Sequence, residues 1–175
     1  AFLEHSGPFA ALQTFFNRYE PRGQVDIELK ASGNLNRIHE STLSGDVYCK
    51  DVTICHSKFQ YPIDHVVGRI GFTEKSVTLC NLVGQHGDAM LVFNGWCRDF
   101  EPNRKYQIQI TSDNMPLDDD LYNALTAKQQ EFWSAFSPTG LAAIDYWFTR
   151  ESPTNKRQKL DVELRGVGAI YQHFP

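Results

Sequence analysis

The chain has 175 residues, of which 41% are hydrophobic and 22% are charged, and its formal net charge is −4. This is the composition of a globular protein with one sizeable core. It excludes a typical nucleic-acid-binding domain, which carries a clustered basic face. No apolar stretch approaches the ~18 residues of a membrane-spanning helix.

Most of the chain alternates between apolar and polar residues with a period of two, which is typical of half-buried β-strands. A helix is expected first, over residues 8–19, and it ends at Pro21 and Gly23. The strands that follow are clearest at residues 24–32 and 106–111. Four more strands are expected between these two, over residues 43–55, 65–72, 76–83 and 89–98.

Short links join the expected strands, with turns at residues 73–75 and 84–87, and they predict antiparallel neighbours in a meander. The apolar pattern of residues 43–55 changes phase partway, which predicts a bulge near Lys50 and Asp51. Glycines inside strand candidates indicate bends and close backbone approach, and hence a strongly curved sheet. These glycines are Gly68, Gly71 and Gly95.

Helical spacing replaces the alternation over residues 117–136. Asp118 is the expected N-cap, the two aspartates after it suit the positive end of the helix dipole, and Pro138 and Gly140 end the helix. One apolar stripe is expected along it, formed by Leu117, Leu121, Leu125, Phe132 and Phe136. The predicted fold is therefore mainly β (α+β), with curved antiparallel β-meander repeats and a connecting helix at about 117–136.

The two helix ends match at an offset of 117 residues, because Pro21 and Gly23 align with Pro138 and Gly140. The aromatic residues before them also align, Phe15, Phe16 and Tyr19 with Phe132, Trp133 and Phe136. A strand follows each glycine, the second over residues 144–148, and then a polar loop. Residues 46–59 next align with residues 161–174 at an offset of 115.

These matches predict about one and a half copies of a repeat, and repeats of this kind build extended surfaces. Residues 1–22 are expected to be the helical end of a preceding repeat, residues 23–137 one full repeat, and residues 138–175 the start of the next. Both ends are expected to be cut from a longer protein.

No motif points to catalysis or to a bound cofactor, and we expect a protein that is not an enzyme. Capping accounts for Asp118, Asp119 and Asp120. Cys55 and His56 are adjacent in an expected strand and point to opposite faces, so they do not chelate a metal together. The cysteines lack CxxC spacing and are expected to be buried thiols, with one disulfide as the open alternative. They are Cys49, Cys55, Cys80 and Cys97.

Other charged and aromatic residues have plain structural explanations. The cationic run at residues 156–159 is expected in a solvated loop, with phosphate head groups as the alternative contact. Arg98 and Arg150 are expected in solvated charge pairs that close strands. The tryptophans are expected in the core, with sugar stacking as the alternative. They are Trp96, Trp133 and Trp147.

Two strand candidates, residues 77–83 and 90–96, are apolar on both faces, and a sheet of this kind must cover both. The connecting helix covers one face. The other is left for a second sheet, a neighbouring repeat or a bound apolar ligand, and an ordinary protein core is the plain alternative.

Five short motifs follow one another along the chain. They are FQYP at residues 59–62, VVGRIGF at 66–72, VTLCNLVG at 77–84, MPLDDDLYNAL at 115–125 and FSPTG at 136–140. Together they resemble the repeats of AsmA/TamB-like proteins, particularly the very long ones of planctomycete-type bacteria. These are similar to the bridge-like lipid transfer proteins, in which β-meanders stack into a long sheet whose apolar concave face holds acyl chains between two membranes.

The resemblance implies a non-enzymatic segment of a bacterial cell-envelope or periplasmic protein, anchored to a membrane through another part of its parent. The implied partners are phospholipid acyl chains and neighbouring repeats of the same chain, with no cofactor and no nucleic acid. The expected lining of the lipid groove is Val25, Ile27, Leu29, Leu91, Phe93, Tyr106, Ile108 and Ile110. The alternative function is a structural or adhesive β-repeat module that binds protein or glycan and has a filled core.

Overall fold

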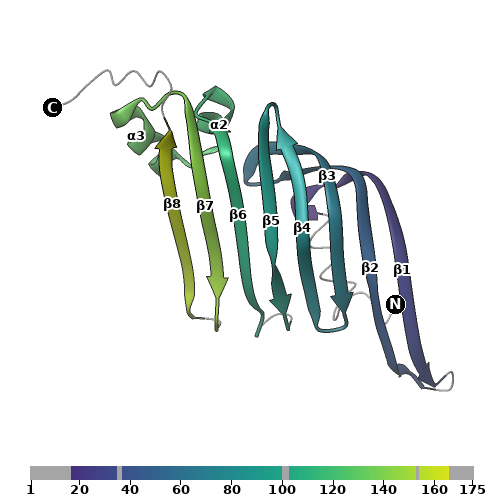
Figure 1. Cartoon of the computed structure of the whole chain (residues 1–175). Coiled ribbons are helices and arrows are strands. Elements are labelled where there is room, and N and C mark those ends of the chain that lie inside the picture. Colours follow the sequence, from purple (N-terminus) through teal and green to yellow (C-terminus); the bar gives the residue numbers. More distant parts are fainter. Residues whose placement is uncertain (1–16, 35–36, 100–102, 153, 166–175) are drawn as a thin grey trace.

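The described part of the chain forms one open sheet of eight antiparallel strands in the computed structural model (Figure 1). The structure describes residues 17–34, 37–99, 103–152 and 154–165. Each strand pairs with its neighbours in sequence, so the predicted antiparallel meander of a mainly β fold is confirmed. The strands are β1 (Arg22–Asn34), β2 (Arg37–His56), β3 (Phe59–Thr73), β4 (Ser76–His86), β5 (Ala89–Arg98), β6 (Lys105–Pro116), β7 (Leu141–Arg150) and β8 (Lys156–Arg165).

A bulge interrupts the pairing of β1 with β2 where the sequence predicts one. Gln24 pairs with Asp51 and Val25 pairs with Cys49, so Lys50 is skipped in the register. A skipped residue restores the phase of the side chains, and the apolar residues on both sides of the bulge therefore share one face of the sheet.

Gly95 lies where two neighbouring strands leave no room for a side chain. Its φ is 151°, and a Cβ atom at this position would overlap the carbonyl oxygen of Gln107 on β6. Gly68 is similar, with a φ of 129° and the backbone of Asn81 close by on β4. Neighbouring strands approach closely at both positions, as expected for glycines inside bent strands.

Two short helices connect β6 to β7, where the sequence predicts a single one. Helix α2 (Asp119–Ala124) has the predicted N-cap, since the Asp118 carboxylate accepts a hydrogen bond from the backbone of Leu121 at 3.0 Å. The chain leaves helical geometry at Leu125, and α3 (Ala127–Phe136) begins after Thr126, whose backbone N–H donates to the Gln129 side chain at 2.9 Å.

The break at Leu125 turns the second half of the predicted apolar stripe away from the sheet. Phe132 is 70% exposed and Phe136 is 41% exposed, and their rings contact each other at a centroid distance of 4.7 Å. Only the first half of the stripe reaches the core, through Leu117 and Leu121.

The cationic run at residues 156–159 opens strand β8, so the prediction of a loop there is wrong, although Lys156, Arg157 and Lys159 are exposed as predicted. Lys156 pairs with Arg150 and Lys159 pairs with Trp147 across the β7–β8 ladder. The turn after β4 is also shorter than the predicted turn at residues 84–87. Gly84 and His86 belong to β4, and the chain turns at Gly87. In both places, strand pairing extends into residues whose polarity suggests a loop.

The core lies under the helices, on one face of the sheet and at one end of its strands. Helix α2 packs against β3, and its Leu121 and Ala124 are buried there. The buried strand residues around them are Tyr61, Ile63, Val66, Leu82, Ala89, Leu91 and Met115. Trp133 of α3 is partly buried against this cluster, which agrees with its expected place in the core.

The two predicted helix ends have similar geometry where both are described. Residues 17–19 are helical, whereas residues 8–16 of the predicted first helix lie outside the described residues. Gly23 and Gly140 both have positive φ angles, of 134° and 102°. The match of residues 46–59 with 161–174 is described only as far as residue 165, so the repeat itself stays a prediction.

Candidate functional site: the apolar face of the sheet

The strand register divides the sheet into one apolar and one polar face, because directly paired residues lie on the same side. On β1, Val25, Ile27 and Leu29 point to the apolar face, whereas Asp26 and Glu28 point to the polar face. This alternation matches the sequence prediction for residues 24–32.

In β4, a strand predicted to be apolar on both faces, Leu79 and Leu82 lie on the same face because the strand is irregular between them. The register with β5 shifts between Leu79 and Leu82, and Asn81 takes a positive φ of 46°. Because Leu79 pairs with Gly95 and Leu82 with Phe93, both leucines face the apolar side. The sequence pattern counts them on opposite sides, since periodicity assumes an unbroken strand.

Two rows of paired residues cross the apolar face. The first runs from β1 to β7 through Ile27, Val47, Ile70, Leu79, Gly95, Ile108 and Phe148. The second runs through Leu29, Gly45, Phe72, Val77, Cys97, Tyr106 and Arg150. We call them the apolar rows; before Arg150, at the far end of the second, they carry no charged side chain.

Exposure along the apolar face falls from the β1 edge towards the helices. Val25, Ile27 and Leu29 are 43%, 57% and 62% exposed. The members of the apolar rows from β2 to β6 are half-buried, and the residues near α2 are fully buried. The sheet therefore has a filled core at its helical end and partly exposed apolar side chains elsewhere.

All eight predicted groove residues lie on the apolar face. Tyr106 and Ile108 belong to the apolar rows, and Phe93 pairs with Ile110 beside them. Leu91 is different, since it is only 4% exposed and belongs to the core. Several row members are not among the predicted groove residues, above all Ile70, Phe72, Val77 and Phe148. Their strands show weak alternation, so the face they occupy follows only from the register.

The polar face carries exposed ion pairs between neighbouring strands. Lys50 lies 3.0 Å from Asp26 and Arg69 lies 3.5 Å from Asp46. On the same face, Nδ1 of His65 forms a hydrogen bond with the Asp51 carboxylate at 2.8 Å. Exposed pairs of this kind contribute about 0–1 kcal/mol each. They place solvent-exposed charge on this face along strands β1 to β3.

One cluster of titratable groups lies where α2 meets the sheet. The rings of Tyr61 and His86 stack at a centroid distance of 3.7 Å, and Nδ1–H of His86 donates to the carbonyl of Pro62 at 2.7 Å. Nε2 of His86 lies 3.5 Å from the Asp120 carboxylate. Burial, followed by the nearby Asp118 and Asp120 carboxylates, raises the pKa of Tyr61. This cluster holds α2 to β3 and β4.

Metal and disulfide chemistry find no support in the described residues. They contain no group of three or more His, Cys, Asp or Glu side chains placed to hold a metal ion. All four cysteines are described and none forms a disulfide. Cys49 is buried, which raises its pKa, whereas the other three are half-buried, so the prediction of buried thiols holds for Cys49 alone.

Trp96, Trp147 and Arg150 differ from their predictions, whereas Arg98 is exposed as expected. Trp96 and Trp147 are half-buried residues of the polar face, each paired with a glutamine of β6. The Arg98 guanidinium lies 4.8 Å from the centroid of the Trp96 ring and covers one side of it. Arg150 is only 6% exposed, so the prediction that it is solvated is wrong.

In the described part of the chain, no helix has the length and apolarity needed to cross a membrane. Comparison with known proteins adds no further constraint: the chain matches no family model, no curated protein and no solved structure.

Proposed function

We propose that this chain is a non-enzymatic segment of an AsmA/TamB-like protein of the bacterial cell envelope, and that it binds lipid acyl chains along its apolar face. The observation that carries the proposal is the pair of apolar rows. They cross seven strands, and outside the helix-covered end their side chains are half-buried or exposed, except for the buried Arg150. Contiguous apolar surface of this kind marks interaction sites in water-soluble proteins.

The chemistry of the rows suits acyl chains. Burying a hydrocarbon chain contributes about 0.8 kcal/mol per CH₂ group and needs no directional contact. The rows offer Ile, Val, Leu and Phe side chains and, at Gly45 and Gly95, positions without a side chain. Such a surface binds chains of different length and unsaturation, which fits a protein that handles bulk phospholipid.

Lipid binding can be tested on the purified chain by extracting bound lipid after gel filtration and identifying it by mass spectrometry. The variant Ile27→Ser with Leu29→Ser removes the two most exposed members of the rows. We expect it to carry less phospholipid than the wild type. The matched control, Asp26→Asn with Glu28→Gln, changes the polar face of the same strand and is expected to carry as much as the wild type. Lipid-free wild-type protein would refute the proposal.

A second candidate, a structural or adhesive module that binds protein or glycan, is favoured by the filled core at the helical end. Tyr61, Ala89 and Ala142 are each at most 2% exposed there. This function predicts lipid-free protein and retarded migration through a gel that contains a polysaccharide. The two candidates therefore give opposite results in the same pair of measurements.

A further inference from the structure

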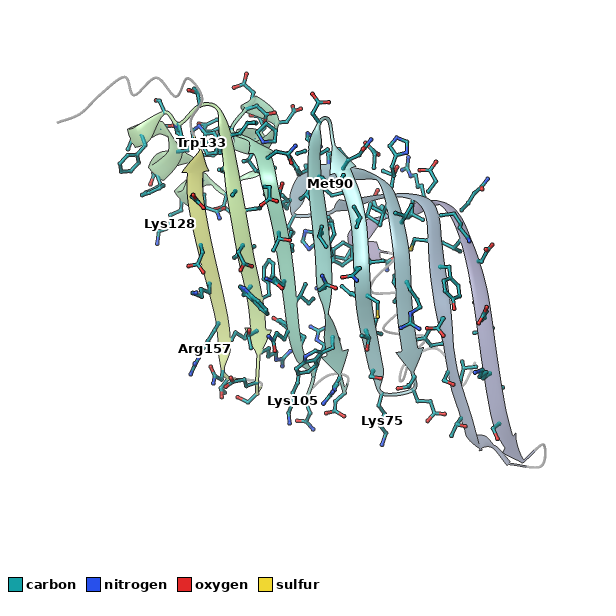
Figure 2. All side chains as sticks on the ribbon, viewed as in Figure 1. Lys75, Met90, Lys105, Lys128, Trp133 and Arg157 are labelled. Carbon is teal, nitrogen blue, oxygen red and sulfur yellow. The ribbon has the colours of Figure 1, made fainter. Side chains whose placement is uncertain are left out.

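Charge is distributed unequally between the two ends of the strands. At one end of the strands lie the described residues of the turns β3–β4, β5–β6 and β7–β8 and the strand residues beside them, and we call these residues the basic end. In Figure 2, Lys75, Lys105 and Arg157 lie at this end, opposite Lys128 and Trp133 of the helical end. The described cations of the basic end are Lys75, Arg98, Arg104, Lys105, Arg150, Lys156 and Arg157. Its described carboxylates are Glu74, Asp99 and Glu151.

The helical end has the opposite sign. The segment between β6 and β7 carries Asp118, Asp119, Asp120 and Glu131 against the single lysine Lys128. The chain as a whole has a net charge of −4, so its positive electrostatic potential is concentrated at the basic end. A local positive potential of this kind attracts anions.

Aromatic rings hold two guanidinium groups of the basic end in place. Arg98 lies over Trp96 on the polar face, and Arg104 lies over Tyr106, at 5.9 Å from the ring centroid, on the apolar face. A guanidinium fixed on a ring loses less conformational freedom when it binds an anion. Arg binds phosphate through paired N–H donors, so these positions suit a phosphate group.

The basic end is continuous with the apolar face. Tyr106 pairs with Arg150, which pairs in turn with Lys156. The last apolar side chain of the second row is therefore followed by two cationic residues on the same face. From Tyr106 to the buried Ser112, six residues along β6, the strand covers about 20 Å. One leaflet of a bilayer has a hydrocarbon depth of about 15 Å, half of the ~30 Å core. The half-buried stretch therefore accommodates an acyl chain laid along the strands.

We propose that the basic end binds the phosphate of an anionic lipid headgroup while the acyl chains of the same lipid extend along the strands towards the helices. This inference rests on the proposed function, because it requires acyl chains on the apolar face. It adds a fixed orientation of the lipid and a preference for anionic headgroups. A headgroup suits the site better than free phosphate, since Arg104 and Lys156 lie beside the second apolar row and a lipid satisfies both.

The test measures headgroup selectivity separately from lipid binding. The full chain is incubated with vesicles of equimolar phosphatidylcholine and phosphatidylglycerol and re-isolated by gel filtration, and the ratio of the two bound lipids is determined by mass spectrometry. We expect phosphatidylglycerol to be enriched on the wild type. In Lys105→Gln with Lys156→Gln, the enrichment should fall roughly thirtyfold, the size expected for two lysines beside an anionic headgroup.

A charge-matched control separates the basic end from net charge. Lys58→Gln with Lys128→Gln removes two exposed lysines at the opposite end of the strands and should keep the wild-type ratio. Lys75→Gln, in an exposed turn, is a second variant that should lower the ratio even if the double variant fails to fold.

Each other outcome overturns the inference in a distinguishable way. Bound lipid with the same ratio in the wild type and both basic-end variants refutes the headgroup site and leaves the proposed function intact. No bound lipid refutes the proposed function itself. Protein that floats with phosphatidylglycerol vesicles but carries no lipid after re-isolation indicates docking on a bilayer surface. Binding of inorganic phosphate that is lost in the double variant, without lipid enrichment, indicates a site for free phosphate.

Discussion

Glu20 and Ser137, 117 positions apart, adopt the same left-handed backbone conformation, with φ angles of 42° and 43°. Ser137 ends α3, and its backbone N–H donates to the carbonyl of Trp133 at 2.7 Å. Residues other than glycine rarely take this conformation, which costs roughly 1–2 kcal/mol. Its occurrence at both helix ends is what a repeat with this offset predicts.

Glycine at these two positions should stabilise the protein. Ser137→Gly and Glu20→Gly each relieve the left-handed strain, and we expect each to raise the free energy of unfolding by about 0.5–1 kcal/mol, measured by urea titration. Ser134→Gly, inside α3, should lower it by about 0.5 kcal/mol, because glycine weakens a helix interior. Destabilisation by Ser137→Gly would show that the serine side chain contributes more than the strain costs.

The difference in burial across the apolar face should appear as a difference in stability. Leu91→Ala removes a core side chain and should cost about 2–5 kcal/mol of unfolding free energy. Ile27→Ala, at an exposed position of the same face, should change it by no more than about 0.5 kcal/mol. A large loss for Ile27→Ala in lipid-free protein would mean that another part of the chain covers β1 in solution.

Gly95 should tolerate no side chain. Gly95→Ala forces a Cβ atom onto the carbonyl of Gln107 at a φ of 151°, and we expect a loss of more than about 2 kcal/mol of unfolding free energy in thermal or urea unfolding. The control is Gly71→Ala, where the nearest atom lies 3.3 Å away in the flexible Asp46 side chain. It should cost less than about 1 kcal/mol. Equal losses at the two positions would contradict a special role for the close β5–β6 approach.

The raised pKa of Tyr61 should make the protein less stable in alkali. The unfolded chain releases this tyrosine proton near pH 10, whereas the folded protein holds it to higher pH, so unfolding is increasingly favoured above pH 10. The expected slope is at most about 1.4 kcal/mol per pH unit for this group. Urea titrations from pH 9 to 11 measure it.

Tyr61→Phe should make this pH dependence shallower, because the group that binds the proton is gone. Tyr122→Phe, on α2, is the matched control for the loss of one phenol. An unchanged slope in Tyr61→Phe would assign the alkaline loss of stability to other groups.

The sequence predicts those parts of the architecture that depend on residues close together in the chain. The alternation of residues 24–32, the bulge at Lys50 and the Asp118 N-cap follow from local patterns, and each is present in the structure. Strand β8 is different, because its polar first residues are held by pairing with β7 across the ladder. Leu82 is another case, since its face depends on the irregularity at Asn81.

The candidate site was accordingly only half predictable. Alternation identifies Ile27 and Ile108 as members of one face, and the register places them in the same row. The basic end could not be found in this way. Its cations come from three turns far apart in sequence, and only the meander brings Lys75, Lys105 and Lys156 to the same end of the strands.

The even number of strands between the two matching glycines has a geometric consequence. Strands β1 and β7 are six positions apart in an alternating sheet, so they run in the same direction. In any longer sheet built with this period, every helical connection would lie along the edge formed by one set of strand ends. Every basic turn would lie along the opposite edge. The assembly would be a ribbon with an acidic margin and a cationic margin, and a charged cargo molecule travelling along it would keep the same orientation from one repeat to the next.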